Sequence, residues 1–342
     1  MKLEAQLSLF AASIFNGVCS QVDLVAKRFD PQRISCLQLI NVSLFPLWIF
    51  LPAPLAYGIA VLRGDLHYRY GKLYSEVDRS YFSREEIIST LKRVFGDQLS
   101  QEERSRVTRD FFRLRCCEIV DAMRFGRGRA FGRLVEIRGL NHIEAALTAG
   151  KGVILCSAHF GSNYACYSLL GSLGLPITHI ASFSYDDDRV SPTQRFFNAL
   201  IRNRLVVHLL QPGKRQAAIL LRQNELISTM LDAHGGPEED TRRITVDFLN
   251  GKASLLPGAI KIAQLTGARV LMMFMRRSSD WRHQVLEISA PMSMEGDIVT
   301  VFRRCFAIVE AAIRRDPAHW RRWTNTDLIV GEKAWRRWST VT

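Results

Sequence analysis

One histidine stands where an apolar strand gives way to a helix, a place from which a side chain can do chemistry. In residues 151–171, KGVILCSAHFGSNYACYSLLG, an apolar run leads directly into Ala-His-Phe-Gly, and Ser162 then stands where a helix cap is expected. His159 would therefore lie beside the free N–H groups of a helix N-terminus, which can stabilise an oxyanion or bind a phosphate. A neutral imidazole there could take a proton from an attacking hydroxyl or amine, or it could merely satisfy a loop carbonyl.

The elements that position His159 alternate between strand and helix from about Val135 onward. This pattern predicts an α/β domain whose central sheet is mostly parallel and flanked by helices. Sites in such sheets lie beyond the carboxyl ends of the strands, where His159 falls. The predicted strands are Gly152–Ser157, Ile177–Ser182, Leu205–Leu210, Leu226–Leu231, Ile244–Phe248, Val270–Met275 and Val285–Ile288. The predicted helices in this part are Ile143–Ala149, Asn163–Leu173, Lys214–Gln223 and Pro257–Thr266.

The N-terminal part has a different character, which predicts contact with a membrane. The run from Leu37 to Leu62 carries no charge and is long enough to cross a bilayer. Prolines at 46, 52 and 54 would break a regular helix, so an interfacial hairpin or a buried segment is an alternative. Basic residues follow at once and favour a cytoplasmic position for the rest of the chain. We therefore expect residues 1–75 to form hydrophobic anchoring or interfacial helices.

Residues 76–134 are expected to form a helical segment and a basic linker, because two polar stretches show helical spacing and each opens with Ser followed by acids. Residues 326–342 form a basic, Trp-rich tail. Arginines near the C-terminus interleave with tryptophans at 320, 323, 335 and 338, a composition typical of the lipid headgroup level. The same composition could stack on single-stranded nucleic acid, but no nucleic-acid-binding motif supports that interpretation.

The overall composition narrows the partners and the compartment. The chain has 342 residues and a formal net charge of +13, which suits an anionic membrane, an acidic carrier protein or a phosphorylated substrate. Its seven cysteines show no metal-ligand spacing and cannot all pair within one chain, which indicates reduced core residues in a reducing compartment. No paired CxxC or HExxH pattern predicts a metal site.

Several stretches share a family likeness in the right order. They are the GVIL…AHFG block around His159, LISTMLDAHGG at 226–236, DFLNGKASLLPGAIKIAQLTGARVLMMFMRR at 247–277, PAHWRRW at 317–323, and the apolar FPLWIFLPAPLAYGIAVL at 45–62. Together they resemble the lipid A late acyltransferases (lauroyl or myristoyl transferases) of the lysophospholipid acyltransferase-like superfamily. The likeness covers roughly residues 45–325 and makes 135–325 an expected acyltransferase domain.

The resemblance implies transfer of a fatty acyl group from a thioester, on acyl carrier protein or coenzyme A, to a hydroxyl or amine of a lipid, glycolipid or secondary-metabolite acceptor. His159 would be the general base, and backbone N–H groups at Phe160, Gly161 and Ser162 would receive the oxyanion. The activated thioester requires no cofactor, metal or covalent enzyme intermediate. The expected location is the cytoplasmic face of the bacterial inner membrane, held peripherally or by a single span.

The likeness also suggests substrate contacts in the 247–277 block. Gly251 belongs to its aromatic-rich turn, and Pro257 begins its Pro-Gly helix start. Arg276 and Arg277 follow a predicted strand and could hold a phosphate or carboxylate by paired hydrogen bonds, or they could be a solvated strand end.

The chain departs from the family pattern at the acid that orients the histidine. The family has His, four residues, then Asp or Glu, but the fifth residue after His159 is Tyr164, and one inserted residue would put Ala165 there. Asp232, at the end of the next apolar block, could replace the acid or be an ordinary turn carboxylate. Tyr164 or Asn163 could hold the imidazole by a neutral hydrogen bond. The third alternative is a catalytically degenerate relative that binds acyl chains or acyl carrier protein.

Overall fold

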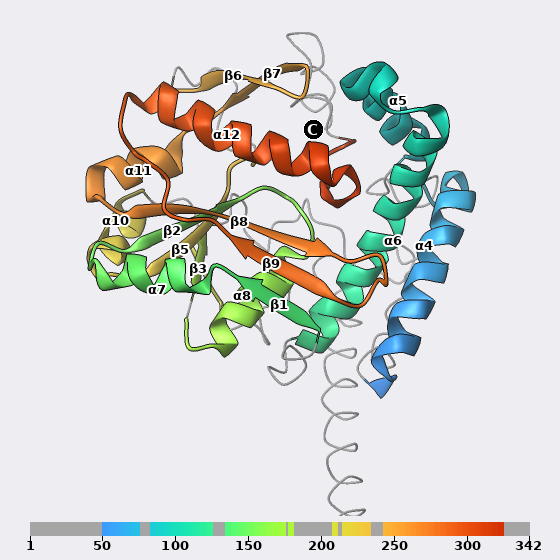
Figure 1. The fold of residues 1–342 in the computed structure, drawn as a ribbon, viewed down its shortest axis with the longest axis horizontal. Helices are drawn as coiled ribbons and strands as arrows, with labels where there is room; N and C mark the ends of the chain where they lie inside the picture. Colours follow the sequence, from blue (N-terminus) through green and yellow to red (C-terminus); the bar gives the residue numbers. More distant parts are fainter. Residues whose placement is uncertain are drawn as a thin grey trace, which may run out of the picture.

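A seven-stranded, mostly parallel sheet lies at the centre of the protein (Figure 1). The computed structural model describes residues 50–75, 83–125, 134–175, 177–180, 207–210, 214–233 and 242–324. The sheet order is β1-β9-β8-β2-β5-β3-β4, and β8 and β9 form its antiparallel pair. The strands are β1 (Val135–Arg138), β2 (Val153–Ser157), β3 (Ile177–Ile180), β4 (Val207–Leu210), β5 (Leu226–Met230), β8 (Arg269–Arg277) and β9 (Gln284–Ile288). The predicted α/β class, with a mostly parallel sheet flanked by helices, is confirmed.

Helices cover both faces of this sheet, which explains why every residue of β2 is buried. Ile154 and Cys156 pack with residues of α10 (Lys214–Arg222), α11 (Gly258–Thr266) and α12 (Ile298–Arg315). Val153 and Leu155 point the other way, toward α7 (Leu140–Thr148) and α8 (Asn163–Ser172). The strand that leads to His159 is therefore held on both sides by apolar packing.

One predicted strand of the central sheet lies elsewhere. Ile244–Phe248 is a strand, β6, but it pairs with β7 (Gly251–Leu255) as a separate antiparallel hairpin. The two-residue link explains this, because Leu249 and Asn250 both have positive φ, the backbone of a tight hairpin turn. Helix α12 was not among the predicted helices, although Asp297 caps it through the Thr300 N–H at 2.7 Å.

Within the segment predicted to be helical before the sheet lie α5 (Arg84–Phe95) and α6 (Gln101–Phe125), joined by the short 3-10 helix η2 (Gly96–Gln98). Both serine caps form. The Ser83 hydroxyl accepts the Glu86 N–H, and Ser100 and Glu103 cap each other reciprocally. The predicted linker falls mostly on residues 126–133, which lie outside the described part.

Helix α4 (Ala53–Ser75) runs along α6 (Figure 1). It packs through Ala56, Tyr57 and Ala60. Gly64 lies so close to α6 that a Cβ built on Gly64 would be 2.5 Å from the Cα of Arg113. Its outer face carries exposed apolar side chains at helical spacing, namely Leu55, Ile59, Leu62 and Leu66. No helix within the described ranges is long and apolar enough to span a membrane. Residues 1–49 of the predicted anchoring region lie outside them.

Candidate active site

The register of two neighbouring strands brings His159 and Asp232 together. In the parallel pair of β2 and β5, Ser157 lies opposite Met230. His159 lies two residues after Ser157, and Asp232 lies two residues after Met230, so both are at the carboxyl edge of the sheet. The Leu231 N–H donates to the Ser157 carbonyl at 2.8 Å and carries the pairing one step further. The two residues are 73 positions apart in sequence, and only the sheet topology makes them neighbours.

The imidazole of His159 and the carboxylate of Asp232 form a hydrogen-bonded dyad. Nδ1 of His159 is 2.8 Å from Oδ1 of Asp232, and the His159 backbone N–H is 3.0 Å from both carboxylate oxygens. Because an ionised carboxylate only accepts, Nδ1 carries the proton, which leaves Nε2 as an acceptor. Asp232 is 0% exposed, whereas the His159 side chain is 28% exposed. The acid is therefore sealed inside while the imidazole reaches the surface.

Asp232 stays ionised despite its burial. Burial by itself would raise the pKa of Asp232. The neighbouring His159, the charge of Arg322 and the hydrogen bond from Trp320 outweigh burial and hold this pKa well below its ordinary value. The Trp320 indole N–H donates to Oδ2 of Asp232 at 2.9 Å. A buried, ionised acid that orients a histidine is the arrangement that activates a general base.

A C-terminal segment, residues 317–323, closes the site like an added strand. It includes the 3-10 helix η4 (Pro317–His319), and Trp320 then pairs with Phe160 as an antiparallel bridge. The Gly161 N–H donates to the His319 carbonyl at 2.9 Å, and the Arg321 N–H donates to the His159 carbonyl at 2.8 Å. The Arg321 side chain also pairs with Glu118 of α6. The histidine turn is thus held between the sheet and this segment.

Comparison with known proteins identifies the family. The sequence model of the bacterial lipid A biosynthesis acyltransferases matches residues 48–324. The chain belongs to this acyltransferase family. It is also similar to a lipid A biosynthesis acyltransferase of Haemophilus influenzae, with 29% identity over 164 residues. That alignment covers 47% of this chain and 49% of the relative, so the chain spans about half the length of the curated relative it matches.

In this family member the carboxylate that contacts the histidine, Asp232, follows β5. Asn163 lies at the start of α8, where its Nδ2 donates to the Ala158 carbonyl at 3.3 Å. It therefore braces the turn and does not contact the imidazole through that group. Tyr164 lies in the same first helical turn, and its side chain is outside the described part. Of the candidates whose side chains the structure describes, Asp232 is the one with a hydrogen bond to the His159 ring.

The predicted oxyanion groups lie beside the dyad, but two are already engaged. The Phe160 N–H donates to the Ala158 carbonyl at 2.7 Å, and the Gly161 N–H donates to His319. Ser162 is the N-cap of α8, and among the described residues its N–H has no backbone partner. Gly161 has a φ of +62°, and a Cβ there would be 1.9 Å from the Met275 carbonyl oxygen. Glycine is required because this turn packs directly on β8.

The two arginines of the acyltransferase block occupy different environments. Arg277 is buried and pairs with Asp121 of α6, and its guanidinium lies over the Tyr57 ring at 5.1 Å. The Tyr57 hydroxyl donates to the same carboxylate at 2.7 Å, so this cluster ties β8 to α4 and α6. The guanidinium of Arg277 is enclosed by these partners, and its position does not fit direct contact with a substrate. Arg276 is partly exposed and pairs with Asp316 at 2.8 Å and Glu287 at 3.1 Å.

Gly251 and Pro257 help to place the hairpin and α11. Gly251 pairs with Phe248 at the end of the β6–β7 hairpin, and Pro257 is the residue before α11. The hairpin approaches the site through Phe248, whose ring packs edge-on against Trp320 with centroids 5.7 Å apart. A substrate-binding role for Gly251 and Pro257 stays a prediction.

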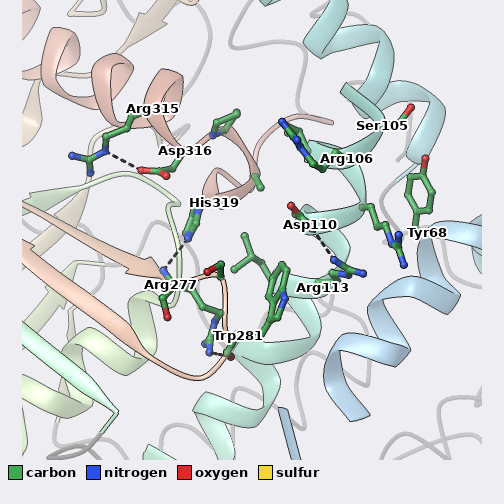
Figure 2. Close-up of a pocket in the computed structure, with 17 residues that line it drawn as sticks. Tyr68, Ser105, Arg106, Asp110, Arg113, Arg277, Trp281, Arg315, Asp316 and His319 are labelled. Atoms are coloured by element: carbon green, nitrogen blue, oxygen red, sulfur yellow. Dashed lines mark hydrogen bonds and ion pairs between the residues drawn. The ribbon is translucent and has the colours of Figure 1, made fainter. Parts of the chain in front are cut away.

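A pocket of about 780 Å³ lies on the other side of the closing segment, between α6 and the turns around 278 and 317 (Figure 2). Its arginines are engaged by acids, as Figure 2 shows for Arg113 with Asp110 and Arg315 with Asp316. His319 lines this pocket, and its ring stacks on Phe160 with centroids 5.3 Å apart. The pocket is thus separated from the dyad by residues 319–320 and is no part of the dyad site.

The main functional contact that the sequence did not predict comes from Trp320. We expected Trp320 and Trp323 at the lipid headgroup level, and this is wrong, because both side chains are 0% exposed. Their neighbouring arginines suggested a surface, but the backbone of this segment pairs with the histidine turn and turns both indoles inward. The other two tryptophans of the pattern lie in the tail, outside the described residues.

Proposed function

We propose that this family member transfers a fatty acyl group from an acyl thioester to a hydroxyl or amine of a lipid acceptor, with His159 as general base. The acceptor class that the family suggests is a lipid A precursor or a related phosphorylated glycolipid. The donor is an acyl group on acyl carrier protein or coenzyme A. The observation that carries the proposal is the dyad, in which a buried ionised Asp232 holds Nδ1 of a partly exposed His159 at 2.8 Å.

The chemical step uses the free nitrogen of the imidazole. Nε2 of His159 removes the proton of the acceptor hydroxyl or amine as the oxygen or nitrogen attacks the thioester carbonyl carbon. The new carbon–oxygen or carbon–nitrogen bond gives a tetrahedral oxyanion. When this intermediate collapses, the carbon–sulfur bond breaks and the thiolate leaves, taking the proton from the imidazolium. The buried Asp232 stabilises the imidazolium between these two proton transfers.

The oxyanion would be received at the start of α8. Of the three predicted backbone groups, Phe160 and Gly161 already donate to carbonyls. We assign the oxyanion to the Ser162 N–H, which has no backbone partner among the described residues. The N-terminal end of α8 adds its partial positive charge at the same place. Because the thioester is already activated, the reaction needs no metal or other cofactor.

The membrane association that we propose is peripheral and involves α4. Its exposed residues Leu55, Ile59, Leu62 and Leu66 form an apolar stripe that would enter the headgroup region. Arg63 and Arg69 belong to the same helix and favour the anionic cytoplasmic face of a bacterial inner membrane. The net charge of +13 also suits an acidic carrier protein that delivers the acyl group.

The degenerate alternative, a module that only binds acyl chains or acyl carrier protein, was motivated by the absence of an acid after the histidine. Asp232 supplies a carboxylate in hydrogen-bonding distance, which favours the enzyme. For the enzyme we propose an acyl thioester and a lipid or small-molecule acceptor as partners, and no nucleic acid.

The test is an acyl-transfer assay of the detergent-solubilised protein. It compares wild type with variants in which one histidine at a time is replaced. Radiolabelled acyl carrier protein and acyl coenzyme A are offered separately, with a lipid A precursor or a crude lipid extract as acceptor. His159→Ala should lower the rate by about 10²- to 10⁴-fold, the usual contribution of a general base. The matched control is His283→Ala, because His283 also contacts an aspartate through Nδ1 but lies in an exposed loop.

Two outcomes would count against the proposal. If wild type retains the acyl chain yet transfers it from neither donor, the binding module is the better description. If transfer occurs and His159→Ala leaves it unchanged, the protein is an acyltransferase whose base lies elsewhere. The donor that supports turnover identifies the thioester form.

A further inference from the structure

We propose that Trp320 is a positioning residue for the dyad, and that its indole N–H fixes the carboxylate of Asp232 and limits how strongly it holds a proton on His159. The inference rests on the proposed function, because it concerns the same imidazole. Trp320 would be a third residue that acts together with His159 and Asp232, which lie in two separate blocks of the sequence. It also gives the C-terminal segment a direct part in the chemistry.

The hydrogen bonds around Asp232 leave its carboxylate one orientation. Oδ1 accepts from Nδ1 of His159 at 2.8 Å, whereas Oδ2 accepts from the Trp320 indole at 2.9 Å. The His159 backbone N–H lies 3.0 Å from each oxygen. Asp232 is fully buried, so water cannot replace a lost donor. Without the indole, Oδ2 would lose its side-chain donor, and the carboxylate would lose a contact that fixes its orientation.

Trp320 is itself rigidly held, which is what a positioning group requires. Its backbone bridges to Phe160, and the hydrogen bonds of the residues before and after it clamp the segment to the histidine turn. Its ring packs edge-on against Phe248 and Trp323, with centroids 5.7 and 4.8 Å away. The indole N–H is therefore directed at Asp232 before any substrate binds.

The physical effect has a definite sign. The indole N–H draws part of the carboxylate charge toward Oδ2 and away from the imidazole. When that donor is removed, the carboxylate interacts more strongly with a protonated His159, so the base form is reached only at higher pH. The acidic limb of the pH profile of kcat/KM should then move upward. Replacing the acid by an amide should move the same limb downward, because the negative charge is gone.

The experiment compares Trp320→Phe with Trp323→Phe in the same acyl-transfer assay. Phe keeps an aromatic ring in the apolar contacts and removes only the N–H and part of the indole. Trp323 is the matched control, because it is equally buried and its indole donates at 2.7 Å to the Pro317 carbonyl, away from Asp232. Trp320→Phe should move the acidic limb up by about half to one pH unit, as expected for one lost hydrogen bond, and lower the plateau about 10-fold. Trp323→Phe should leave the limb in place.

A double-mutant cycle separates positioning from simple packing. In the Asp232→Asn background, Trp320→Phe should add little further shift, because the charge on which the indole acts is absent. Equal limb positions in Trp320→Phe and wild type, with His159→Ala inactive, would overturn the inference and leave the proposed function intact. If His159→Ala is fully active, the proposed function fails before the role of Trp320 is at issue.

A spectroscopic measurement tests the contact without any activity. The indole N–H signal that disappears in Trp320→Phe identifies Trp320 in the ¹⁵N-labelled protein. Its proton should be shifted downfield and exchange slowly in wild type, and it should move upfield in Asp232→Asn because a neutral acceptor is weaker. A signal that is unchanged by Asp232→Asn would show that the indole does not bind the carboxylate. This readout also serves if Trp320→Phe folds but is too weakly active for the transfer assay.

Discussion

Two histidine–aspartate pairs in this protein have nearly the same contacts and very different surroundings. His159 and Asp232 meet through Nδ1, and the His159 backbone N–H also reaches the carboxylate. His283 and Asp280 meet through Nδ1 as well, and the His283 N–H donates to that carboxylate at 3.0 Å. The first acid is 0% exposed, whereas the second is 35% exposed and three residues from its histidine in a surface turn.

The difference shows that the hydrogen bond alone does not make a catalytic dyad. In the exposed pair, water and salt screen the charge of Asp280. Asp280 and His283 are close because they belong to the same short turn. In the buried pair, the whole sheet, the glycine turn and the closing segment together hold two residues from different strands. Protein groups alone orient Asp232, and its charge acts on the imidazole without screening by water. Burial of the acid and contacts between distant segments therefore distinguish His159, the candidate base, from His283.

The largest difference that we expect is in kcat when the aspartate of each pair is replaced. Asp232→Asn should lower kcat by about 10²-fold or more, because the amide can hold the imidazole in the wrong tautomer and cannot stabilise the imidazolium. Asp280→Asn should change kcat less than about twofold, because its histidine takes part in no proposed step and the pair is exposed. Steady-state acyl transfer by both variants, with thermal unfolding as a check on folding, measures the contrast. Equal losses in the two variants would remove the distinction between the pairs.

The turn that carries His159 gives the next largest effect, this time on stability. Gly161→Ala should destabilise the fold by about 3 kcal/mol or more, because a Cβ would clash with the Met275 carbonyl in addition to straining the backbone. Gly174→Ala is the control, since its φ is +80° and nothing lies within 4 Å of an added Cβ. That variant should cost only about 1 kcal/mol of backbone strain. Urea unfolding of both compares them, and similar losses would show that β8 does not constrain the turn.

Part of this architecture could be predicted from the sequence for simple reasons. Alternating apolar strands and amphipathic helices indicated the sheet, and the block around His159 marked its carboxyl edge. The sequence also contained Asp232 at the end of another strand, but it did not show that β2 and β5 are neighbours. Strand order depends on how distant segments pack, so the sequence left Asp232 as one of three candidates.

The contacts that the sequence could not predict come from segments whose local composition is misleading. Trp320 and Trp323 stand among arginines, a pattern that indicates a surface, yet backbone pairing with the histidine turn buries both. Arg277 followed a strand like a ligand-binding arginine, but α6 provides a buried partner in Asp121. In each case a contact from a remote segment decides the environment of the side chain, and no local pattern records that contact.

The smallest predicted effect extends the comparison of buried and exposed histidines to the pH dependence of stability. His179 of β3 is buried, its Nδ1 is 2.9 Å from the Ser228 hydroxyl, and its ring packs on Tyr167. Burial, and then the nearby His159, lower the pKa of His179 from 6.5 to about 4. His283 is half exposed and lacks that environment.

The sign follows from proton linkage. Between about pH 6.5 and 4, the unfolded chain binds a proton at His179 that the folded chain does not, so stability falls as the pH is lowered through this window. The full loss from this residue is about 3 kcal/mol, and His67, with a pKa also lowered to about 4, adds to the same trend. His179→Gln cannot take up the proton, so its unfolding free energy should vary less between pH 6.5 and 4 than that of wild type. His283→Gln should retain the wild-type slope, and a His179→Gln slope equal to that of wild type would show that this histidine is protonated as easily in the fold as outside it.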